Sequence, residues 1–373
     1  MIIGIPKETA SDERRVATSP DTVSRLKGKG FSVLIETGAG QTAHFSDESF
    51  VKSGAEIAGD RQELFAKADI IAKIQAPSQD EIELFKEGQI LVCSLDAYNN
   101  KELIQQLAHK KVTTFALELV PRISRAQSMD ILSSQANLAG YKAVLMAANA
   151  YNGLFPMFMT AAGTVRAAKV LVLGAGVAGL QAIATAKRLG AIVSAFDIRS
   201  AVKEEIQSLG AKFVELDLGI GDMQDEGGYA RELTDDERKK QSELLGKFME
   251  KMDIVITTAA IPGRPSPKLI MEETVKNMRE GSVIVDLAAE GGGNCVLTEP
   301  GQTVSPYGVR IIGTLNLPSL LSTEASNLFA RNILNFLNNM LDTEGKLEVN
   351  PEDEIIAGSL ITHQGETVHP NFK

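Results

Sequence analysis

The chain has 373 residues, of which 44% are apolar and 23% charged, a composition that is typical of a soluble globular protein and excludes a disordered or fibrous one. The length favours two domains, each long enough to bury a core of its own. The formal net charge of −10 argues against nucleic acid or an anionic membrane as a partner, because both need clustered lysine and arginine.

Cysteine usage and the opening residues indicate where the protein resides. Cys93 and Cys295 are too few for a disulfide framework, so we expect a reducing, cytoplasmic environment. The opening, MIIGIPKETASDERR, becomes charged before any apolar stretch long enough for a secretory signal. No spacing in the chain is typical of a metal site.

The first third of the chain alternates short apolar runs with amphipathic stretches, which predicts a parallel sheet with helices on its faces. Strands are expected at 2–5, 32–36, 70–74, 90–93 and 114–117, and helices near 20–28 and 101–109. A polar loop at 121–133, PRISRAQSMDILS, precedes a helix that leads into the second domain. The most apolar stretch, 143–163, contains Asn149, Asn152 and Pro156, and we expect it to form a buried helix between the domains and not a membrane span.

The most informative motif lies at 169–199, where an apolar strand enters a GxGxxG turn, a helix follows and a second strand ends on an aspartate. GxGxxG alone is a weak signal, but this context is that of a dinucleotide-binding fingerprint. Gly174 permits the tight turn, Gly176 lets the backbone approach a pyrophosphate, and Gly179 lets the helix pack closely. The helix N-terminus favours the phosphates. The alternative is a glycine-rich turn in an ordinary α/β domain.

Asp197, about twenty residues after the turn, indicates which nicotinamide nucleotide is bound. Its carboxylate can accept hydrogen bonds from a ribose 2′-OH and would repel a 2′-phosphate, so we expect NAD(H) in preference to NADP(H). Arg199 could weaken this preference, although such an arginine is more often solvated or next to the pyrophosphate. The expected cofactor contacts are Gly174, Ala175, Gly176, Val177, Ala178, Gly179, Asp197, Ile198 and Arg199.

A second α/β series follows the fingerprint, with strands expected at 254–257, 282–286 and 309–312. The glycine-rich segment 218–231 is expected to be a lid over the cofactor or a surface excursion, and a capping box at Thr234 and Glu237 starts a helix through about Met252. A late amphipathic helix at 328–341 is expected to return to the first domain. The predicted fold is therefore α/β, with two doubly wound parallel-sheet, Rossmann-like domains, 1–134 plus 320–373 and 135–319, and a cleft between them.

Two segments resemble a known family. The polar loop, with Arg122, Gln127, Asp130 and Ser133, resembles the signature loop of the NAD(H)-binding component of proton-translocating nicotinamide nucleotide transhydrogenase. The opening IGIPKE, followed by Arg15, resembles the shared start of that component and of its relative, alanine dehydrogenase. The resemblance covers essentially the whole chain.

The resemblance implies a set of site residues and partners. Arg122, Gln127 and Asp130 would act on the nicotinamide in hydride transfer. Further cofactor contacts would come from Ile123, Ser124, Leu132, Ser133, Gly228, Tyr229, Gln241 and Ala260. The implied protein is a homodimeric, cytoplasmic component at the inner face of the cell membrane, and its partners are an NADP(H)-binding domain and a membrane-spanning subunit.

Two positions separate the transhydrogenase component from alanine dehydrogenase. The dehydrogenase family uses a lysine and a histidine, and here the matching positions hold Gln75 and Asp96, which cannot replace them. Arg15, which would hold a substrate carboxylate in the dehydrogenase, is expected here to form a salt bridge between the domains. A stand-alone dehydrogenase and a non-catalytic NAD-sensing module remain the alternatives.

Overall fold

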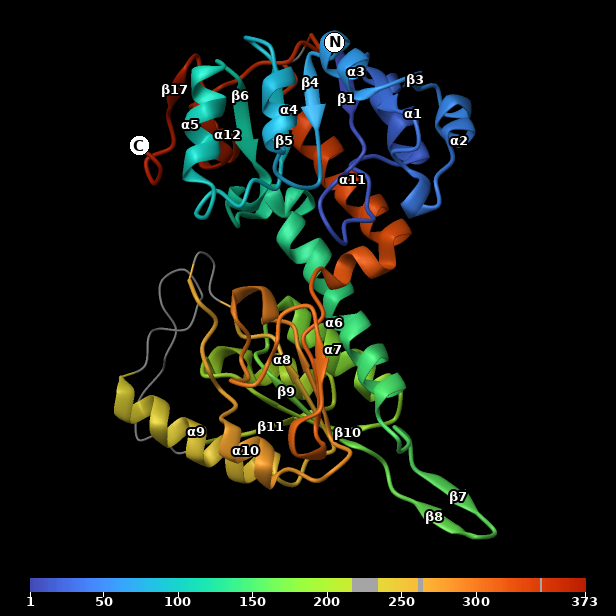
Figure 1. The fold of residues 1–373 in the computed structure, drawn as a ribbon, viewed down its shortest axis with the longest axis vertical. Coiled ribbons are helices and arrows are strands. Elements are labelled where there is room, and N and C mark those ends of the chain that lie inside the picture. The colour runs from blue at the N-terminus through green and yellow to red at the C-terminus, as the bar shows by residue number, and fades with distance from the viewer. Residues whose placement is uncertain (217–233, 261–263, 343) are drawn as a thin grey trace. The chain divides into compact units, whose positions relative to one another are not determined.

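The computed structural model spans residues 1–373 and describes all of them except 217–233, 261–263 and 343. The chain divides into two compact units, which we call unit 1 (Met1–Gln135 with Pro318–Lys373) and unit 2 (Ala136–Leu317). The chain leaves unit 1 within the helix α6 (Ile131–Ala150) and returns to it at Pro318 (Figure 1).

Unit 1 is built on an eight-stranded sheet in the order β17-β16-β6-β5-β4-β1-β2-β3. β1 to β6 are parallel, and β16 and β17 are added antiparallel at one edge. The expected strands of this region are confirmed, with ends shifted by at most two residues. The strands are β1 (Ile2–Ile5), β2 (Ser32–Glu36), β3 (Glu56–Ala58), β4 (Ile70–Ala72), β5 (Ile90–Cys93), β6 (Thr113–Ala116), β16 (Leu360–His363) and β17 (Glu366–Thr367).

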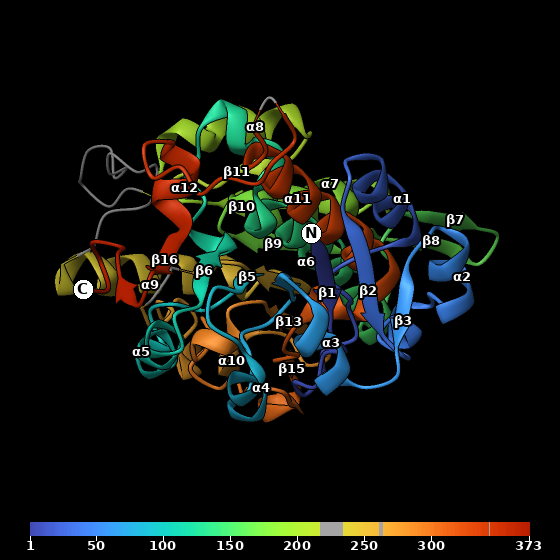
Figure 2. The ribbon, with the colours of Figure 1, turned by 90° about the horizontal axis from the view of Figure 1, so that it is seen from above.

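Helices cover both faces of this sheet because alternate strand residues point to opposite sides. Ile70 and Ala72 pack in the core shared with α1, α11 and α12, whereas Ile71 packs in the core shared with α3 and α5. Figure 2 shows the two groups of helices on either side of the strands. The helices are α1 (Pro20–Gly28), α2 (Asp47–Lys52), α3 (Arg61–Lys67), α4 (Gln79–Leu84), α5 (Lys101–His109), α11 (Ser322–Asn339) and α12 (Glu354–Ser359). α11 contains most of the expected late helix, and its apolar residues pack in the core of unit 1.

Unit 2 contains a seven-stranded sheet in the order β11-β10-β9-β12-β13-β15-β14, parallel except for β14. Its strands are β9 (Lys169–Leu173), β10 (Ile192–Phe196), β11 (Lys212–Phe213), β12 (Ile254–Thr257), β13 (Val283–Asp286), β14 (Thr303–Val304) and β15 (Arg310–Ile312). Its further helices are α7 (Val177–Arg188), α8 (Lys203–Ser208), α9 (Asp235–Met249) and α10 (Glu272–Asn277). One core packs α6, α7 and α8 on one face and another packs α9 and α10 on the other, so the predicted doubly wound α/β fold is confirmed.

The prediction of one buried helix through 143–163 is wrong beyond Ala150, where α6 ends. The strands β7 (Phe158–Thr160) and β8 (Gly163–Val165) instead form an antiparallel hairpin, which extends away from the sheet of unit 2 in Figure 1. Asn152, Gly153 and Pro156 end the helix because none of these residues continues a helical backbone well. Among the described residues, no helix is both long and apolar enough to cross a membrane.

Candidate functional site

Two of the three glycines in the turn between β9 and α7 lie in close contact with neighbouring atoms. Gly174 has a φ of 94°, and a Cβ there would lie 2.6 Å from Oγ1 of Thr258. A Cβ on Gly179 would lie 1.9 Å from the carbonyl oxygen of Gly174, so a side chain at 179 would push α7 away from the strand. These two glycines are therefore required by the fold itself.

Gly176 differs because a Cβ there would meet no atom within 4 Å. It is the N-cap of α7, and no side chain caps this helix end. An uncapped helix N-terminus presents backbone N–H groups and the positive end of the helix dipole. The open side of Gly176 thus fits a pyrophosphate at this helix end.

Asp197 lies at the end of β10, is 9% exposed, and holds the glycine turn directly. Its Oδ2 accepts a hydrogen bond from the N–H of Ala175 at 2.8 Å. Arg199 donates to the same carboxylate from Nε at 2.9 Å, from Nη2 at 2.8 Å and from its backbone N–H at 2.9 Å. Arg199 is therefore an ion-pair partner of Asp197, and its guanidinium donates to both oxygens of the carboxylate that is expected to accept the ribose hydroxyls.

The segment that follows β12 lies against the glycine turn. The N–H of Thr258 donates to the carbonyl of Leu173 at 2.8 Å, and its hydroxyl donates to the carbonyl of Gly174 at 3.1 Å. Ala260 is exposed directly after this contact. The structure therefore brings together the turn, Asp197 and the segment containing Ala260, and Thr258 is a member of this cluster that sequence reasoning missed.

Three other expected cofactor contacts come from beyond the glycine turn. Gln241 is buried within α9, 4% exposed. Gly228 and Tyr229, with the whole of the expected lid at 218–231, lie outside the described residues. The capping box of Thr234 and Glu237 at the start of α9 is confirmed.

The polar loop of unit 1 is a short 3-10 helix, Ser124–Met129, followed directly by α6. Asp130 accepts from the N–H of Ser133 at 2.8 Å and from its hydroxyl at 2.6 Å, so Asp130 caps the start of α6. Six residues of the loop are exposed and Ile123 is half-buried; the exposed ones are Arg122, Ser124, Arg125, Gln127, Ser128 and Leu132.

The loop is anchored by α11 and α12. Asn332 and Asn335 of α11 donate to the carbonyl of Ser128 at 2.8 and 3.1 Å. Arg125 forms a 2.8 Å ion pair with Asp353, which caps α12. This ion pair lowers the pKa of Asp353. The backbone of the loop is thus fixed while its polar side chains stay exposed.

Arg15 does not form the expected salt bridge between domains, because its partners belong to unit 1. Its Nε and Nη2 donate to Glu13 at 2.8 and 2.6 Å, and Nη1 donates to Gln135 at 2.8 Å. Gln75 donates to the same Glu13 carboxylate at 2.8 Å. Burial alone would raise the pKa of Glu13, but the hydrogen bonds and charge of Arg15 outweigh it and hold the pKa at about 2.

A second buried cluster lies beside this one at the end of β4. Lys73, 1% exposed, lies 2.7 Å from Glu81 and 3.5 Å from Glu8. The N–H of Ile74 donates to Glu8 at 2.6 Å. Burial nevertheless raises the pKa of Glu8 to about 7, against the attraction of Lys73.

Asp96 is the position that the resemblance is expected to match with the histidine of the dehydrogenase family. Its carboxylate accepts from the amide of Asn99 at 3.0 Å, and its φ of 50° places it in a tight turn.

Both cysteines, Cys93 and Cys295, are free and buried.

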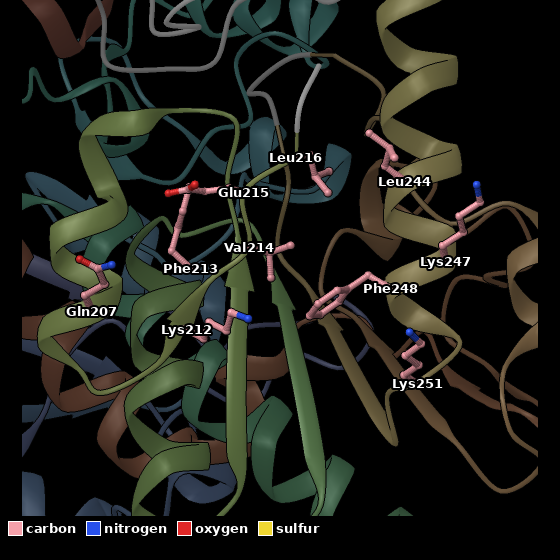
Figure 3. Close-up of a pocket in the computed structure, with 10 residues that line it drawn as sticks. All are labelled: Gln207, Lys212, Phe213, Val214, Glu215, Leu216, Leu244, Lys247, Phe248 and Lys251. Carbon is pink, nitrogen blue, oxygen red and sulfur yellow. The ribbon is translucent and has the colours of Figure 1, made fainter. Parts of the chain in front are cut away.

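A hollow of about 670 Å³ lies elsewhere in unit 2. Figure 3 shows it between the end of β11 and α9, which contributes Leu244, Lys247 and Phe248; Lys251, just after α9, also lines it. It includes none of the expected site residues. Its lining ends at Leu216, where the described residues stop, so we assign it no ligand.

Comparisons with known proteins agree with these observations. Family models for the N-terminal and C-terminal domains of alanine dehydrogenase/PNT match residues 4–139 and 143–370. The first part of the NAD(P) transhydrogenase subunit alpha of Rhodospirillum rubrum is 51% identical, over 99% of this chain and 98% of its own length. The crystal structure of transhydrogenase from Sinorhizobium meliloti, 45% identical, matches with a TM-score of 0.87 over 100% of both chains.

An alanine dehydrogenase of Methanococcus maripaludis is more distant, at 32% identity over 86% of this chain and 82% of its own length. The resemblance inferred from the polar loop and the opening residues is therefore confirmed. The chain belongs to the alanine dehydrogenase/PNT family.

Proposed function

We propose that this protein is the NAD(H)-binding peripheral component of a proton-translocating NAD(P)⁺ transhydrogenase. Hydride passes between NADH bound to this chain and NADP⁺ held on a partner subunit. The observation that carries the proposal is the open space beside Gly176, at the uncapped start of α7 and next to Asp197. The identity to transhydrogenase subunits, higher than that to the alanine dehydrogenase, supports this activity over amino-acid oxidation.

The residues of this chain bind and orient, and the bound nicotinamide supplies the hydride chemistry. Backbone N–H groups at the uncapped start of α7, from Gly176 onward, hold the pyrophosphate, and Asp197 selects the unphosphorylated ribose. On the family resemblance, we assign positioning of the nicotinamide to Arg122, Gln127 and Asp130. Transfer between two nicotinamide rings releases no proton from a substrate, so juxtaposition is the main requirement.

The alternative, an alanine dehydrogenase-like enzyme, is disfavoured by the groups found at the two discriminating positions. Gln75 is neutral and donates to Glu13, and Asp96 accepts from Asn99. Neither an amide nor a carboxylate replaces the lysine and the histidine that the dehydrogenase family uses at these positions.

Partners and location follow from the same proposal. The NADP(H)-binding domain and the proton pathway belong to other subunits, one of which spans the membrane, and this chain binds at the cytoplasmic face. We also propose a homodimer, which the exposed apolar side chains of the β7–β8 hairpin support.

The test measures hydride transfer from NADH to an NADP⁺ analogue when the chain is mixed with the NADP(H)-binding partner. We expect transfer only in the mixture, and no oxidation of alanine by the chain with NAD⁺. Alanine turnover on the order of 1 per second or faster would instead establish the dehydrogenase. NADH binding without transfer in the mixture would indicate a sensing module.

A further inference from the structure

Asn294 is fully buried at the carboxyl edge of the unit 2 sheet, and its side-chain amide forms two hydrogen bonds with the backbone of Ala259. Nδ2 donates to the carbonyl of Ala259 at 2.8 Å, and Oδ1 accepts from the N–H of Ala259 at 3.1 Å. A second bond from Nδ2 reaches the carbonyl of Pro267 at 2.8 Å. Pairing with both backbone groups of Ala259 fixes that residue much as a neighbouring strand would.

Asn294 is itself held rigidly. Its carbonyl accepts from the N–H groups of Leu269 and Ile270 at 2.8 and 3.0 Å. The next residue, Cys295, donates its N–H to the buried carboxylate of Asp286 at 3.1 Å, and Asp286 also accepts from the hydroxyl of Thr257 at 2.8 Å. Asn294 is thus part of a frame that joins the ends of β12 and β13.

This frame holds the segment that meets the glycine turn. The hydroxyl and N–H of Thr258 bond to the carbonyls of Gly174 and Leu173, and a Cβ on Gly174 would lie 3.3 Å from the N–H nitrogen of Ala259. A shift of Ala259 would therefore move the surface next to the turn, together with the exposed Ala260.

We propose that Asn294 is a positioning residue that holds 258–260 for the nicotinamide half of the cofactor; this rests on the proposed function. β10, which carries Asp197, and β12 flank β9 on opposite sides. A dinucleotide whose pyrophosphate lies on the turn, with its adenosine ribose toward Asp197, extends its other half toward β12. Asn294 therefore acts on one half of the ligand only.

Two ligands separate this role from a general structural one. 5′-AMP contains the adenosine half of NADH and lacks the nicotinamide half. We expect Asn294→Ala to raise the Kd for NADH by about tenfold, the effect of losing an ordered hydrogen-bond network, and to change the Kd for 5′-AMP by less than about twofold. Calorimetric titration of the purified chain measures both values.

Gln89 offers a matched control in unit 1. It is 5% exposed, its Nε2 donates to the carbonyls of Phe65 and Ala68 at 2.7 Å each, and its Oε1 accepts from the N–H of Lys86 at 2.7 Å. Gln89→Ala removes the same number and kind of bonds as Asn294→Ala, so it should lower the free energy of unfolding similarly. Neither Kd should change in the Gln89 variant.

If Asn294→Ala does not fold, Asn294→Ser takes its place, since it also removes the paired bonds to Ala259 and introduces no buried charge. Equal weakening of NADH and 5′-AMP, or no weakening of NADH beyond that in Gln89→Ala, would overturn the positioning role. If the native chain binds neither ligand, the proposed cofactor site itself is wrong, and the role of Asn294 is rejected with it.

Discussion

At the scale of single residues, Asp197 combines two tasks, because it braces the glycine turn at Ala175 and is expected to select the ribose. We predict that Asp197→Asn weakens NADH binding by roughly 1.5 to 3 kcal/mol, the value of a charge-assisted hydrogen bond. Fluorescence titration with NADH and NADPH measures the effect. The native chain should prefer NADH strongly, and equal affinity for the two nucleotides would contradict the assignment.

Arg199 allows the opposite test at the same carboxylate. Its guanidinium occupies both oxygens of Asp197 and lowers the negative charge presented to a 2′-phosphate. Arg199→Gln should therefore increase the preference for NADH over NADPH, mainly by weakening NADPH. If the ratio of NADPH affinity to NADH affinity is unchanged in the variant, the ion pair has no part in selectivity. If this ratio rises, the predicted direction of the effect is wrong.

Glu8 predicts a pH dependence of stability. Burial raises its pKa from 4.5 to about 7, so the folded state favours the neutral carboxyl. The stability associated with this neutral form is fully present below pH 4.5 and is lost as the pH rises through 7. The glutamine of Glu8→Gln cannot ionise. The free energy of unfolding of this variant, relative to that of the native chain, should therefore rise by on the order of 3 kcal/mol between pH 5 and 8. Urea unfolding across this range measures it.

The control for this measurement is Glu48→Gln, whose side chain is 76% exposed in α2. The comparison separates an effect of the buried Glu8 carboxyl from an effect of any Glu→Gln substitution. If the free energies of unfolding of the native protein and of Glu8→Gln change with pH in parallel, burial does not shift the pKa of Glu8 and the prediction is wrong.

At the scale of elements, the β7–β8 hairpin exposes apolar side chains that a monomer leaves in water. Met159 is 79% exposed, and Met157, Phe158 and Val165 are 59%, 48% and 41% exposed. Such a patch is typical of a protein interface. We predict that Met159→Asp converts the proposed dimer to a monomer, as measured by sedimentation or light scattering.

Val51→Asp is the matched control, since Val51 is 52% exposed on α2, outside the hairpin. It should leave the assembly unchanged. A monomeric native chain, or a dimer that survives Met159→Asp, would exclude the hairpin as the interface.

At the scale of the whole molecule, the proposed function depends on placing one nicotinamide against another. Gln127 is exposed on a loop whose backbone is fixed by Asn332, Asn335 and the Arg125–Asp353 ion pair. Gln127→Asn should therefore leave folding intact and lower hydride transfer far more than NADH affinity. A displacement near 1 Å can cost about a hundredfold in rate.

The measurement pairs transfer to an NADP⁺ analogue, in the presence of the partner, with NADH titration of the variant alone. Gln105→Asn, an exposed glutamine on α5, should affect neither quantity. If the affinity of Gln127→Asn collapses while transfer at saturating NADH stays normal, Gln127 is a binding residue only.

The sequence by itself determined the class of fold, the glycine turn and the family, because these depend on short-range patterns. Alternating apolar runs predicted the central strands, and the spacing of Gly174, Gly176 and Gly179 between a strand and a helix predicted their different backbone roles. Strand ends were less well predicted, because pairing with neighbouring strands decides where a strand stops.

Only the tertiary structure decided which charged and polar groups meet. Arg15 and Gln135 are 120 residues apart in sequence yet hydrogen-bonded, and Asn294 reaches back 35 residues to Ala259. No local pattern encodes such partners, since burial requires a polar group to be paired but does not specify with which group. The hairpin after α6 was missed for a similar reason: its apolar residues have the composition of a core, and only the fold shows that they are exposed among the described residues.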